Sequence, residues 1–395
     1  MTTDSYDVVI IGGGVIGSST AYFLASQPDF GGTIAVIEKD STYETAATPR
    51  SAGGVRQQFS TPENVVMSQF AAIFYKSVDE YLAVGNEKPA INFRENGYLF
   101  LATHSGLKTL LANHRTQHEY GAETLLWTPQ ELSERFPWVN TADLAGATFG
   151  PSNEGWIDPY GLLQAFRKKA RSLDVAYIPG EVVGLEMDGN RVSAVKLKEG
   201  GRIACGAVVN AAGYRARTIA AFAGIDLPVH PRKRFIYVFD CREEVESDSM
   251  PLTIDPSGVW FRPESGNFIC GVSPEDADDP DTTDFELDYR PFEELIWPTL
   301  AHRVPMFEAI KMIRAWAGHY DYNVLDQNVL IGPAPRVPNF HFANGFSGHG
   351  LQQSPAIGRA LSELITYGEY RTLDLGRFSF ERVAEGALIK EDNIV

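Results

Sequence analysis

Residues 6–25, YDVVIIGGGVIGSSTAYFLA, decide the fold of the first part of the chain. A short apolar run leads into three glycines in GxGxxG spacing, Gly12, Gly14 and Gly17, and then into a helical pattern of apolar residues. A second apolar run, TIAVIE, ends at Glu38, which lies 21 residues after Gly17. Strand, glycine turn, helix, second strand and acid together form the dinucleotide-binding fingerprint of a Rossmann-type βαβ unit.

Each part of this fingerprint has a physical role. The glycines allow a tight turn and let a pyrophosphate approach the helix that begins near Val15 and Ile16. Glu38, which Lys39 follows, can accept hydrogen bonds from an adenosine ribose and would repel the ribose phosphate of NADP. Only one such fingerprint is present in the sequence, so the chain is expected to bind either FAD or a nicotinamide dinucleotide, and these residues leave the choice open.

Composition limits the remaining possibilities. A length of 395 residues favours two domains, and 34 basic against 51 acidic residues, a net charge of −17, argue against nucleic acid as a partner. The three cysteines, Cys205, Cys241 and Cys270, are far apart, and the eight histidines show no metal-binding spacing, so we expect a reducing compartment and no metal site. The sequence contains no apolar run long enough for a membrane span. The start, MTTDSYD, is typical of neither a signal nor a transit peptide, which favours a cytoplasmic location.

Two further segments combine strands with small-residue turns. Residues 200–222, GGRIACGAVVNAAGYRARTIAAF, indicate a strand, a turn at Ala211-Ala212-Gly213 and a helix, after a meander of short strands that contains Val182. Residues 345–355, GFSGHGLQQSP, form a glycine-rich loop, and Ser354-Pro355 at its end predicts a helix start. Taken singly, these segments are ordinary sheet and turn.

Their order resembles the D-amino-acid oxidase family of flavoproteins, which includes sarcosine oxidase and glycine oxidase. The resemblance spans nearly the whole chain. The segments SAGGVRQQFS, GVWFRP, WAGHYDYNVLDQN and GFSGHGLQQSPAIGRA, and the tail IKEDNIV, are similar to one subgroup of this family. That subgroup contains a mitochondrial member linked to the assembly of respiratory complex I.

The resemblance implies an α/β fold in two discontinuous parts. A Rossmann-type FAD-binding domain is expected from residues 1–80, 150–225 and 325–395, and a substrate-binding domain from residues 81–149 and 226–324. A mixed or antiparallel sheet of the second domain would roof the flavin, and the alternation in residues 232–240 and 258–272 is compatible with its strands. The run 275–288, with eight acids in fourteen residues, is expected to be a solvated loop.

The resemblance also implies a cofactor, FAD, and the residues that hold it. The loop 345–352 would wrap the flavin ring, and the helix after it would point its N-terminus at the flavin carbonyl. The expected cofactor-binding residues are Gly12, Gly14, Val15, Ile16, Gly17, Glu38, Lys39, Arg50, Ser51, Ala52, Gly53, Gly54, Val182, Ala211, Ala212, Gly213, Gly318, Gly345, Gly348, His349, Gly350, Leu351 and Gln352.

The activity implied by the resemblance is oxidation of the C–N bond of a small, N-substituted amino acid. Arg56 matches the family's carboxylate-binding arginine, although a purely structural role remains an alternative. Gln352 stands where relatives have a second carboxylate-binding lysine, which favours a larger or more polar substrate than sarcosine. Arg262, His319 and Tyr320 are candidates to compensate.

The mode of FAD attachment and the electron acceptor are predicted from departures. Relatives attach FAD through a cysteine that matches Gly318, so noncovalent FAD is expected. Ile269 stands where those oxidases have an oxygen-activating lysine, and Ser273 replaces a nearby histidine. Unless Lys233 or Arg262 reaches the flavin, this favours a dehydrogenase that passes electrons to a quinone or an electron-transfer protein. The alternatives are an oxidase that makes hydrogen peroxide, and an FAD-binding assembly protein with little turnover.

Overall fold

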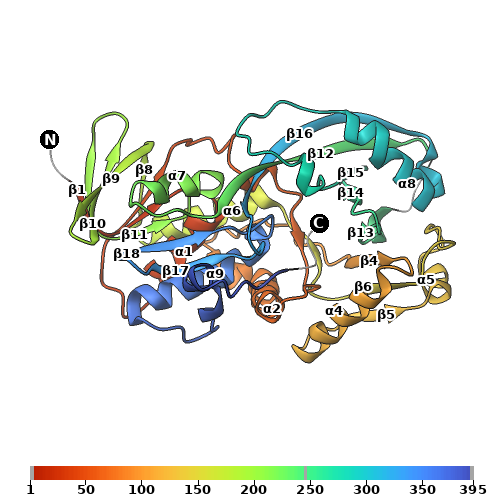
Figure 1. Cartoon of the computed structure of the whole chain (residues 1–395), viewed down its shortest axis with the longest axis horizontal. Coiled ribbons are helices and arrows are strands. Elements are labelled where there is room, and N and C mark those ends of the chain that lie inside the picture. Colours follow the sequence, from red (N-terminus) through yellow and green to blue (C-terminus); the bar gives the residue numbers. More distant parts are fainter. Residues whose placement is uncertain (1–3, 244–246, 392–395) are drawn as a thin grey trace.

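The computed structural model describes residues 4–243 and 247–391. In this part of the chain, all strands except β3 and β7 form two eight-stranded sheets, which occupy the two ends of the elongated molecule in Figure 1. Two long strands, β12 (Val229–Cys241) and β16 (Ile310–Asn323), arch from the first end of the molecule to the second. The predicted α/β class with a second, roofing sheet is confirmed.

The first sheet is the Rossmann-type sheet, with the strand order β17-β18-β11-β1-β2-β8. Strand β10 also pairs with β11, and β9 pairs with β10. Strand β1 pairs in parallel with both β2 and β11. Its residues 8–11 are all buried, as expected for a parallel strand that is covered on both faces. The strands of this sheet are β1 (Asp4–Ile11), β2 (Ile34–Glu38), β8 (Ala176–Pro179), β9 (Val182–Asp188), β10 (Arg191–Leu197), β11 (Arg202–Asn210), β17 (Leu330–Ala334) and β18 (Val337–Asn344).

The second sheet has the order β16-β12-β15-β14-β13-β4-β6-β5 and is antiparallel except between β13 and β4. Besides β12 and β16 it contains β4 (Tyr98–Ala102), β5 (Leu125–Trp127), β6 (Gly146–Gly150), β13 (Leu252–Ile254), β14 (Trp260–Glu264) and β15 (Asn267–Gly271). A separate two-stranded ladder joins β3 (Gly54–Val55) to β7 (Gly155–Trp156). The predicted roof strands are therefore present, while the exact domain limits stay a prediction.

Helices cover the first sheet and the outside of the second. They are α1 (Val15–Ala25), α2 (Pro62–Lys76), α3 (Val78–Leu82), α4 (Leu107–Glu119), α5 (Pro129–Arg135), α6 (Pro159–Ser172), α7 (Ala216–Ala221), α8 (Trp297–Arg303), α9 (Gly350–Tyr367) and α10 (Glu381–Glu385). Helices α1 and α9 cross closely: the Ser19 hydroxyl donates to the Ser354 carbonyl at 2.7 Å. A Cβ at Gly358 would lie 2.4 Å from Ser19 Oγ, so glycine is needed at this crossing.

Helix α9 corrects the predicted helix start. It begins at Gly350 instead of Ser354-Pro355, and Pro355 lies inside it. A proline at this position cannot donate to the carbonyl of Leu351, four residues back. That carbonyl instead accepts from the hydroxyls of Tyr75 and Ser354, both at 2.9 Å, so no acceptor is left unsatisfied. The helix N-terminus consequently lies four residues earlier than the sequence pattern indicates.

His341 makes acid stability a testable property of the first sheet. It lies in β18 with 8% of its surface exposed, and burial lowers the pKa of its ring to about 4. The unfolded chain therefore binds a proton more readily than the folded protein. Above pH 6.5 the ring is neutral in both states and the free energy of unfolding is not reduced, whereas between pH 6.5 and pH 4 protonation of the unfolded chain lowers the free energy of unfolding. Between pH 7 and pH 5 this residue alone should cost about 2 kcal/mol of unfolding free energy.

The measurement is urea unfolding of the wild type and His341→Gln at both pH values. The variant cannot take up the proton, so its loss of stability between pH 7 and pH 5 should be smaller by about that amount. Equal losses in the two proteins would contradict the prediction.

Candidate active site

The loop between β1 and α1 forms one wall of the site. Gly12 has φ of 101°, and a Cβ there would lie 2.3 Å from the carbonyl oxygen of Ala211. A Cβ at Gly17 would lie 1.9 Å from the carbonyl oxygen of Gly12. Both obstacles are backbone atoms, which cannot swing away. The strand, turn and helix therefore meet as closely as the glycine fingerprint predicts.

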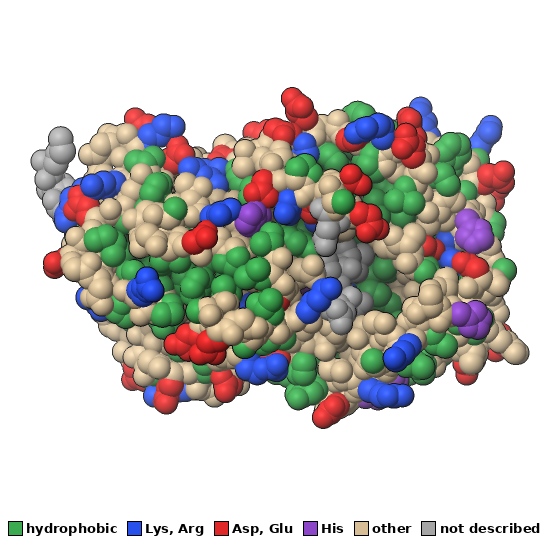
Figure 2. Space-filling model, viewed as in Figure 1, with side chains coloured by type: hydrophobic (Ala, Val, Ile, Leu, Met, Phe, Trp, Pro, Cys, Tyr) green, Lys and Arg blue, Asp and Glu red, His purple; other side chains and the backbone are tan. Residues whose placement is uncertain are grey.

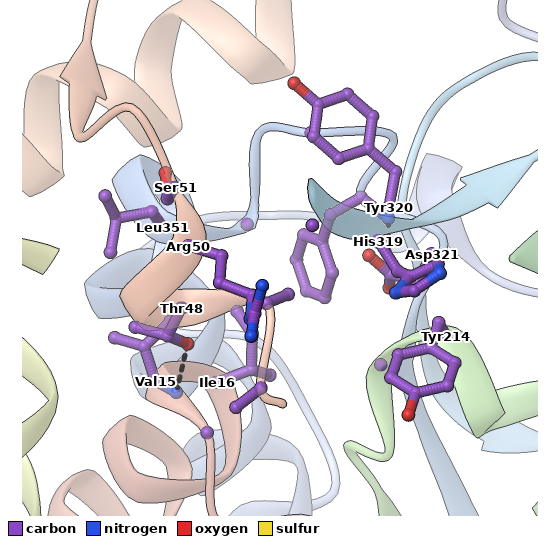
Figure 3. A pocket seen from close by; sticks show the side chains of 18 of the residues that line it. Val15, Ile16, Thr48, Arg50, Ser51, Tyr214, His319, Tyr320, Asp321 and Leu351 are labelled. Atoms are coloured by element: carbon purple, nitrogen blue, oxygen red, sulfur yellow. Dashed lines mark hydrogen bonds between the residues drawn. The ribbon is translucent and has the colours of Figure 1, made fainter. Parts of the chain in front are cut away.

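Two side chains hold this loop in place. The carboxylate of Glu38 accepts from the backbone N–H groups of Gly13 and Asp40, both at 2.8 Å. Burial raises the pKa of Glu38, while these hydrogen bonds act against the rise. The Thr48 hydroxyl accepts from the N–H of Val15 at 3.1 Å, at the start of α1 (Figure 3). Sequence reasoning missed Thr48, because it lies 33 residues away in an irregular segment.

A large cavity lies between the β1–α1 loop and the second sheet. Segments from much of the chain line this cavity. The predicted cofactor residues on its wall are Gly12, Gly14, Val15, Ile16, Glu38, Lys39, Arg50, Ser51, Ala52, Gly54, Val182, Ala211, Ala212, Gly213, Gly318, Gly348, His349, Gly350, Leu351 and Gln352. The predicted substrate residues Arg56, His319 and Tyr320 line the same cavity. Gly17, Gly53 and Gly345 support it from behind, where added side chains would meet Gly12, Ile157 and Asn323.

The segment 50–54 is tied to β16. The Arg50 guanidinium donates to the Ala317 carbonyl at 2.6 Å, and the Trp316 indole donates to the Arg50 carbonyl at 2.9 Å. Figure 3 shows the Arg50 side chain in the middle of the cavity view, between α1 and the strand that carries His319 and Tyr320. A Cβ at Gly318 would lie 3.2 Å from Arg50 Cβ, so this strand and the segment approach each other closely.

The glycine-rich loop before α9 is shaped by Asp321. Its carboxylate accepts from the N–H groups of Gly345 and Phe346, at 2.8 and 3.3 Å, and burial raises its pKa to about 6. Gly348 has φ of 98°, and a Cβ there would lie 2.5 Å from the Tyr320 ring. The loop therefore depends on glycine for contact with Tyr320. Asp321 was not predicted, although it stands in the conspicuous segment WAGHYDY.

Arg56 lies deep in the cavity wall with 3% of its surface exposed. The backbone N–H of Arg56 donates to Gln352 Oε1 at 2.7 Å, and the Arg56 guanidinium lies 3.0 Å from His349 Nε2. Burial, reinforced by the charge of Arg56, holds the pKa of His349 well below its usual range. His349 is therefore neutral, and its Nε2 can accept from the guanidinium.

Tyr320 lies within the influence of two positive charges, those of Arg234 and Arg56. Burial raises the pKa of its hydroxyl, while the charges of Arg234 and Arg56 act against the rise. The Arg234 guanidinium lies 5.2 Å from the Tyr320 ring centre and also lines the cavity. Sequence reasoning missed Arg234 in favour of its neighbour Lys233. The neighbouring His319 ring lies between the rings of Tyr214 and Phe285, at 4.8 and 4.6 Å, and burial lowers its pKa.

Arg262 is placed differently from its predicted role as a substrate-binding cation. Its guanidinium donates twice to the Ala52 carbonyl, at 2.9 and 2.7 Å, and pairs with Glu264. It therefore supports the segment 50–54 from behind. Lys233 pairs with Asp284 at 2.6 Å, and Ile269 packs in an apolar cluster. Arg262 is paired directly with Ile269 in the β14–β15 ladder, but its guanidinium is held by the Ala52 carbonyl and Glu264.

The acidic run 275–288 is not simply a solvated loop, which corrects the prediction. Asp279 is 7% exposed and forms a two-bond ion pair with Arg234, both bonds at 2.8 Å. Asp281 pairs with His230 and Arg232, so the run lies along the basic start of β12. The sequence could not show this, because these partners lie 45 to 51 residues apart along the chain.

Within residues 4–243 and 247–391, no group of three or more histidine, cysteine or acidic side chains could hold a metal ion. No helix in the described part of the chain is both long and apolar enough to cross a membrane.

A glycine-rich loop at the end of a Rossmann-type strand, followed by a helix and a second strand that ends in an acid, is the architecture of a dinucleotide-binding site. The chain belongs to the family of FAD-dependent oxidoreductases described as DAO, whose family model matches residues 7–364. It is 44% identical to FAD-dependent oxidoreductase domain-containing protein 1 of Xenopus laevis over 98% of this chain and 85% of that protein. It is 26% identical to rat mitochondrial dimethylglycine dehydrogenase over 93% of this chain and 43% of that protein.

Solved structures agree with this assignment. The L-proline dehydrogenase of P. horikoshii superposes with a TM-score of 0.86 at 29% identity, over 98% of this chain and all of that chain. Family membership implies FAD as the cofactor, and the residues fit it. The backbone at Gly12, Gly14 and Gly348 lies bare on the cavity wall, and Glu38 lies at the end of β2 where the ribose is expected.

Proposed function

We propose that the protein oxidises the C–N bond of a small, N-substituted amino acid. The observation that carries this proposal is Arg56, a deeply buried guanidinium on the wall of the cavity that fits FAD. The relatives named L-proline dehydrogenase and dimethylglycine dehydrogenase act on N-substituted amino acids, which supports this substrate class. Bound FAD would accept the hydride from the carbon next to the amine, and water would hydrolyse the resulting imine.

The side chains around the cavity would bind and orient the substrate. The planar fork of Arg56 can bind a carboxylate through two hydrogen bonds. Neutral His349 adds no competing charge beside it, and the Tyr320 hydroxyl, whose pKa is raised by burial, stays protonated and can donate. A substrate amine that binds in its neutral form needs no general base. The chain would therefore act through position and electrostatics.

Gln352 favours a substrate that is larger or more polar than sarcosine, such as a dicarboxylic or opine-like secondary amine. Its amide oxygen accepts from Arg56, so its Nε2 group can donate to a ligand without adding a charge. The test is an anaerobic screen of N-alkyl amino acids that follows the loss of flavin absorbance. A preference for sarcosine or glycine would contradict this substrate class. If no amine reduced the flavin, the alternative of an assembly protein would be favoured.

FAD is expected to be held without a covalent bond. Gly318 offers no sulfur at the position where relatives attach the flavin, and the three cysteines lie elsewhere, at residues 205, 241 and 270. Precipitation of the purified protein with acid should leave the yellow colour in the supernatant. Flavin absorbance that remains in the washed pellet would contradict the prediction.

Reoxidation by dioxygen is expected to be slow. Ile269 is 1% exposed and packs against Ile236 and Val238, so it brings no positive charge to stabilise developing superoxide. We propose a quinone or an electron-transfer protein as the acceptor. The measurement is stopped-flow mixing of substrate-reduced protein with aerated buffer. Rapid reoxidation with one hydrogen peroxide per flavin would instead identify an oxidase.

A further inference from the structure

The segment from Arg56 to Thr61 connects β3 to α2 without forming a helix or a strand. Its backbone N–H groups therefore need acceptors from elsewhere, since unsatisfied buried donors are costly. Three side chains distant in sequence supply them. Gln352 accepts from the first N–H of the segment, and two buried carboxylates, Glu154 and Glu391, accept from later ones.

Glu154 holds the middle of the segment. It has no exposed surface, and its carboxylate accepts from Gln57 N at 2.6 Å and from Gln58 Nε2 at 2.8 Å. The side-chain oxygen of Gln58, Oε1, accepts from Thr148 Oγ1 at 2.6 Å. The carbonyl of Gln58 in turn accepts from the Arg56 guanidinium at 3.4 Å. Glu154 is thus connected to the guanidinium through a single residue.

Glu391 holds the far end of the segment, from the last stretch of the described chain. It is 1% exposed and accepts from Ser60 N at 2.8 Å, Ser60 Oγ at 2.6 Å, Thr61 N at 3.0 Å and Asn64 Nδ2 at 2.9 Å. Thr61 is the residue before α2 and its own side chain makes no capping bond. Glu391 therefore places a negative charge at the N-terminus of α2, where the helix dipole favours it.

The backbone that carries Glu391 is itself fixed. Asn328 Nδ2 donates to the Ile389 carbonyl at 2.7 Å, and Glu391 N donates to the Asp326 carbonyl at 3.2 Å. Asp326 is in turn held by a buried ion pair with Arg382 at 2.7 Å. The carboxylate of Glu391 is therefore presented from a rigid network.

We propose that Glu391 is a positioning residue for the reaction, which together with Glu154 fixes the segment 56–61 so that the Arg56 guanidinium meets the substrate carboxylate. This inference rests on the proposed function, because it assigns no separate ligand. Both carboxylates also act electrostatically on the arginine. Burial lowers the pKa of Arg56, and the nearby Tyr98, Glu391 and Glu154 act against that fall. The guanidinium thereby stays charged in a buried position.

A positioning role makes a different prediction from a purely structural one. Displacement of a binding group by about 1 Å weakens its interaction strongly. The hydrogen bonds of Glu391 described above go to Ser60, Thr61 and Asn64, none of which is an expected cofactor-binding residue. Loss of the Glu391 charge should therefore weaken carboxylate binding and raise KM, with kcat and FAD content close to wild type. A structural role would instead lower FAD content and thermal stability together with binding.

The experiment compares Glu391→Gln with Glu385→Gln, which removes an exposed carboxylate from the same part of the chain. Sodium benzoate is titrated into the FAD-loaded proteins, and its binding is followed by the change in the flavin spectrum. FAD content and melting temperature are measured alongside. We expect Glu391→Gln to bind benzoate about tenfold more weakly than wild type, and Glu385→Gln to match wild type. Ser60→Ala, which removes one hydrogen bond to Glu391, should give a smaller loss and decides the matter if Glu391→Gln does not fold.

Arg56→Gln separates the two hypotheses. If wild type and Arg56→Gln bind benzoate equally, the proposed carboxylate site is wrong. If Arg56→Gln binds weakly while Glu391→Gln and Ser60→Ala bind as wild type does, the positioning role is overturned and the proposed function stands. Losses of benzoate binding that merely follow losses of FAD would also overturn the positioning role.

Discussion

Arg56→Ala should raise the half-saturating concentration of an amino-acid substrate by a factor that corresponds to about 2–5 kcal/mol, roughly thirtyfold to several thousandfold. The size of the effect follows from burial, because Arg56 is 3% exposed and a substrate carboxylate would be left without its partner away from water. The measurement is kcat/KM at equal FAD content, with the amine found in the anaerobic screen.

Arg290→Ala is the matched control for this substitution. Arg290 also pairs with an acid, Asp288, but its side chain is 78% exposed, so its removal should leave KM unchanged. An unchanged KM in Arg56→Ala would remove this arginine from the substrate site and favour its structural role.

Gly17→Ala should yield a protein that holds little or no FAD. The added Cβ would lie 1.9 Å from the carbonyl oxygen of Gly12 and 3.2 Å from Ile10 Cγ2. The first obstacle is backbone, so α1 must move away from β1, and the N–H groups expected at the pyrophosphate would move with it. The ratio of visible to protein absorbance after incubation with FAD measures the loss.

Gly31→Ala is the control for the glycine substitution. A Cβ at Gly31 would meet no atom within 4 Å, so this variant should bind FAD as the wild type does. If Gly17→Ala took up a full complement of FAD, the glycine-rich loop between β1 and α1 would not be the cofactor site.

The fingerprint residues could be predicted from the sequence because their geometry is local. The turn at Gly12, the helix start near Val15 and the acid at Glu38 lie within one βαβ unit. Strand β12 of the second sheet was also predictable, since residues 235–239, FIYVF, form a short apolar run of aromatic and β-branched side chains, which favours a strand. Family resemblance added the distant cavity residues, which no local pattern could bring together.

The corrections have a common physical cause in long-range contacts. The local sequence around Pro355 predicts a helix start. However, the Tyr75 hydroxyl donates to the Leu351 carbonyl, to which the proline cannot donate, so α9 continues through Pro355. The acidic run reads locally as solvated, but β12 presents Arg232 and Arg234 to it. In both cases the deciding partner lies more than forty residues away.

The residues that sequence reasoning missed share the same property. Asp321 acts on a loop 24 residues further on, while Glu154 and Glu391 act on the Arg56 segment across 97 and 331 residues. Asp321 and Glu391 lie in the segments WAGHYDYNVLDQN and IKEDNIV, whose resemblance to the family does not show what either acid contacts. Their importance follows from burial and from the backbone donors that they satisfy.

The strand order of the first sheet sets a limit on when the protein can become functional during its synthesis. Strand β18 pairs with β11, and α9 packs on α1, where Ser19 and Ser354 meet although 335 positions separate them in the chain. A nascent chain that has emerged from the ribosome only as far as β16 still lacks the cavity wall at Gly348–Gln352. A complete cofactor site therefore forms only after α9 has been synthesised, and until then the incomplete cavity is exposed to misfolding and aggregation.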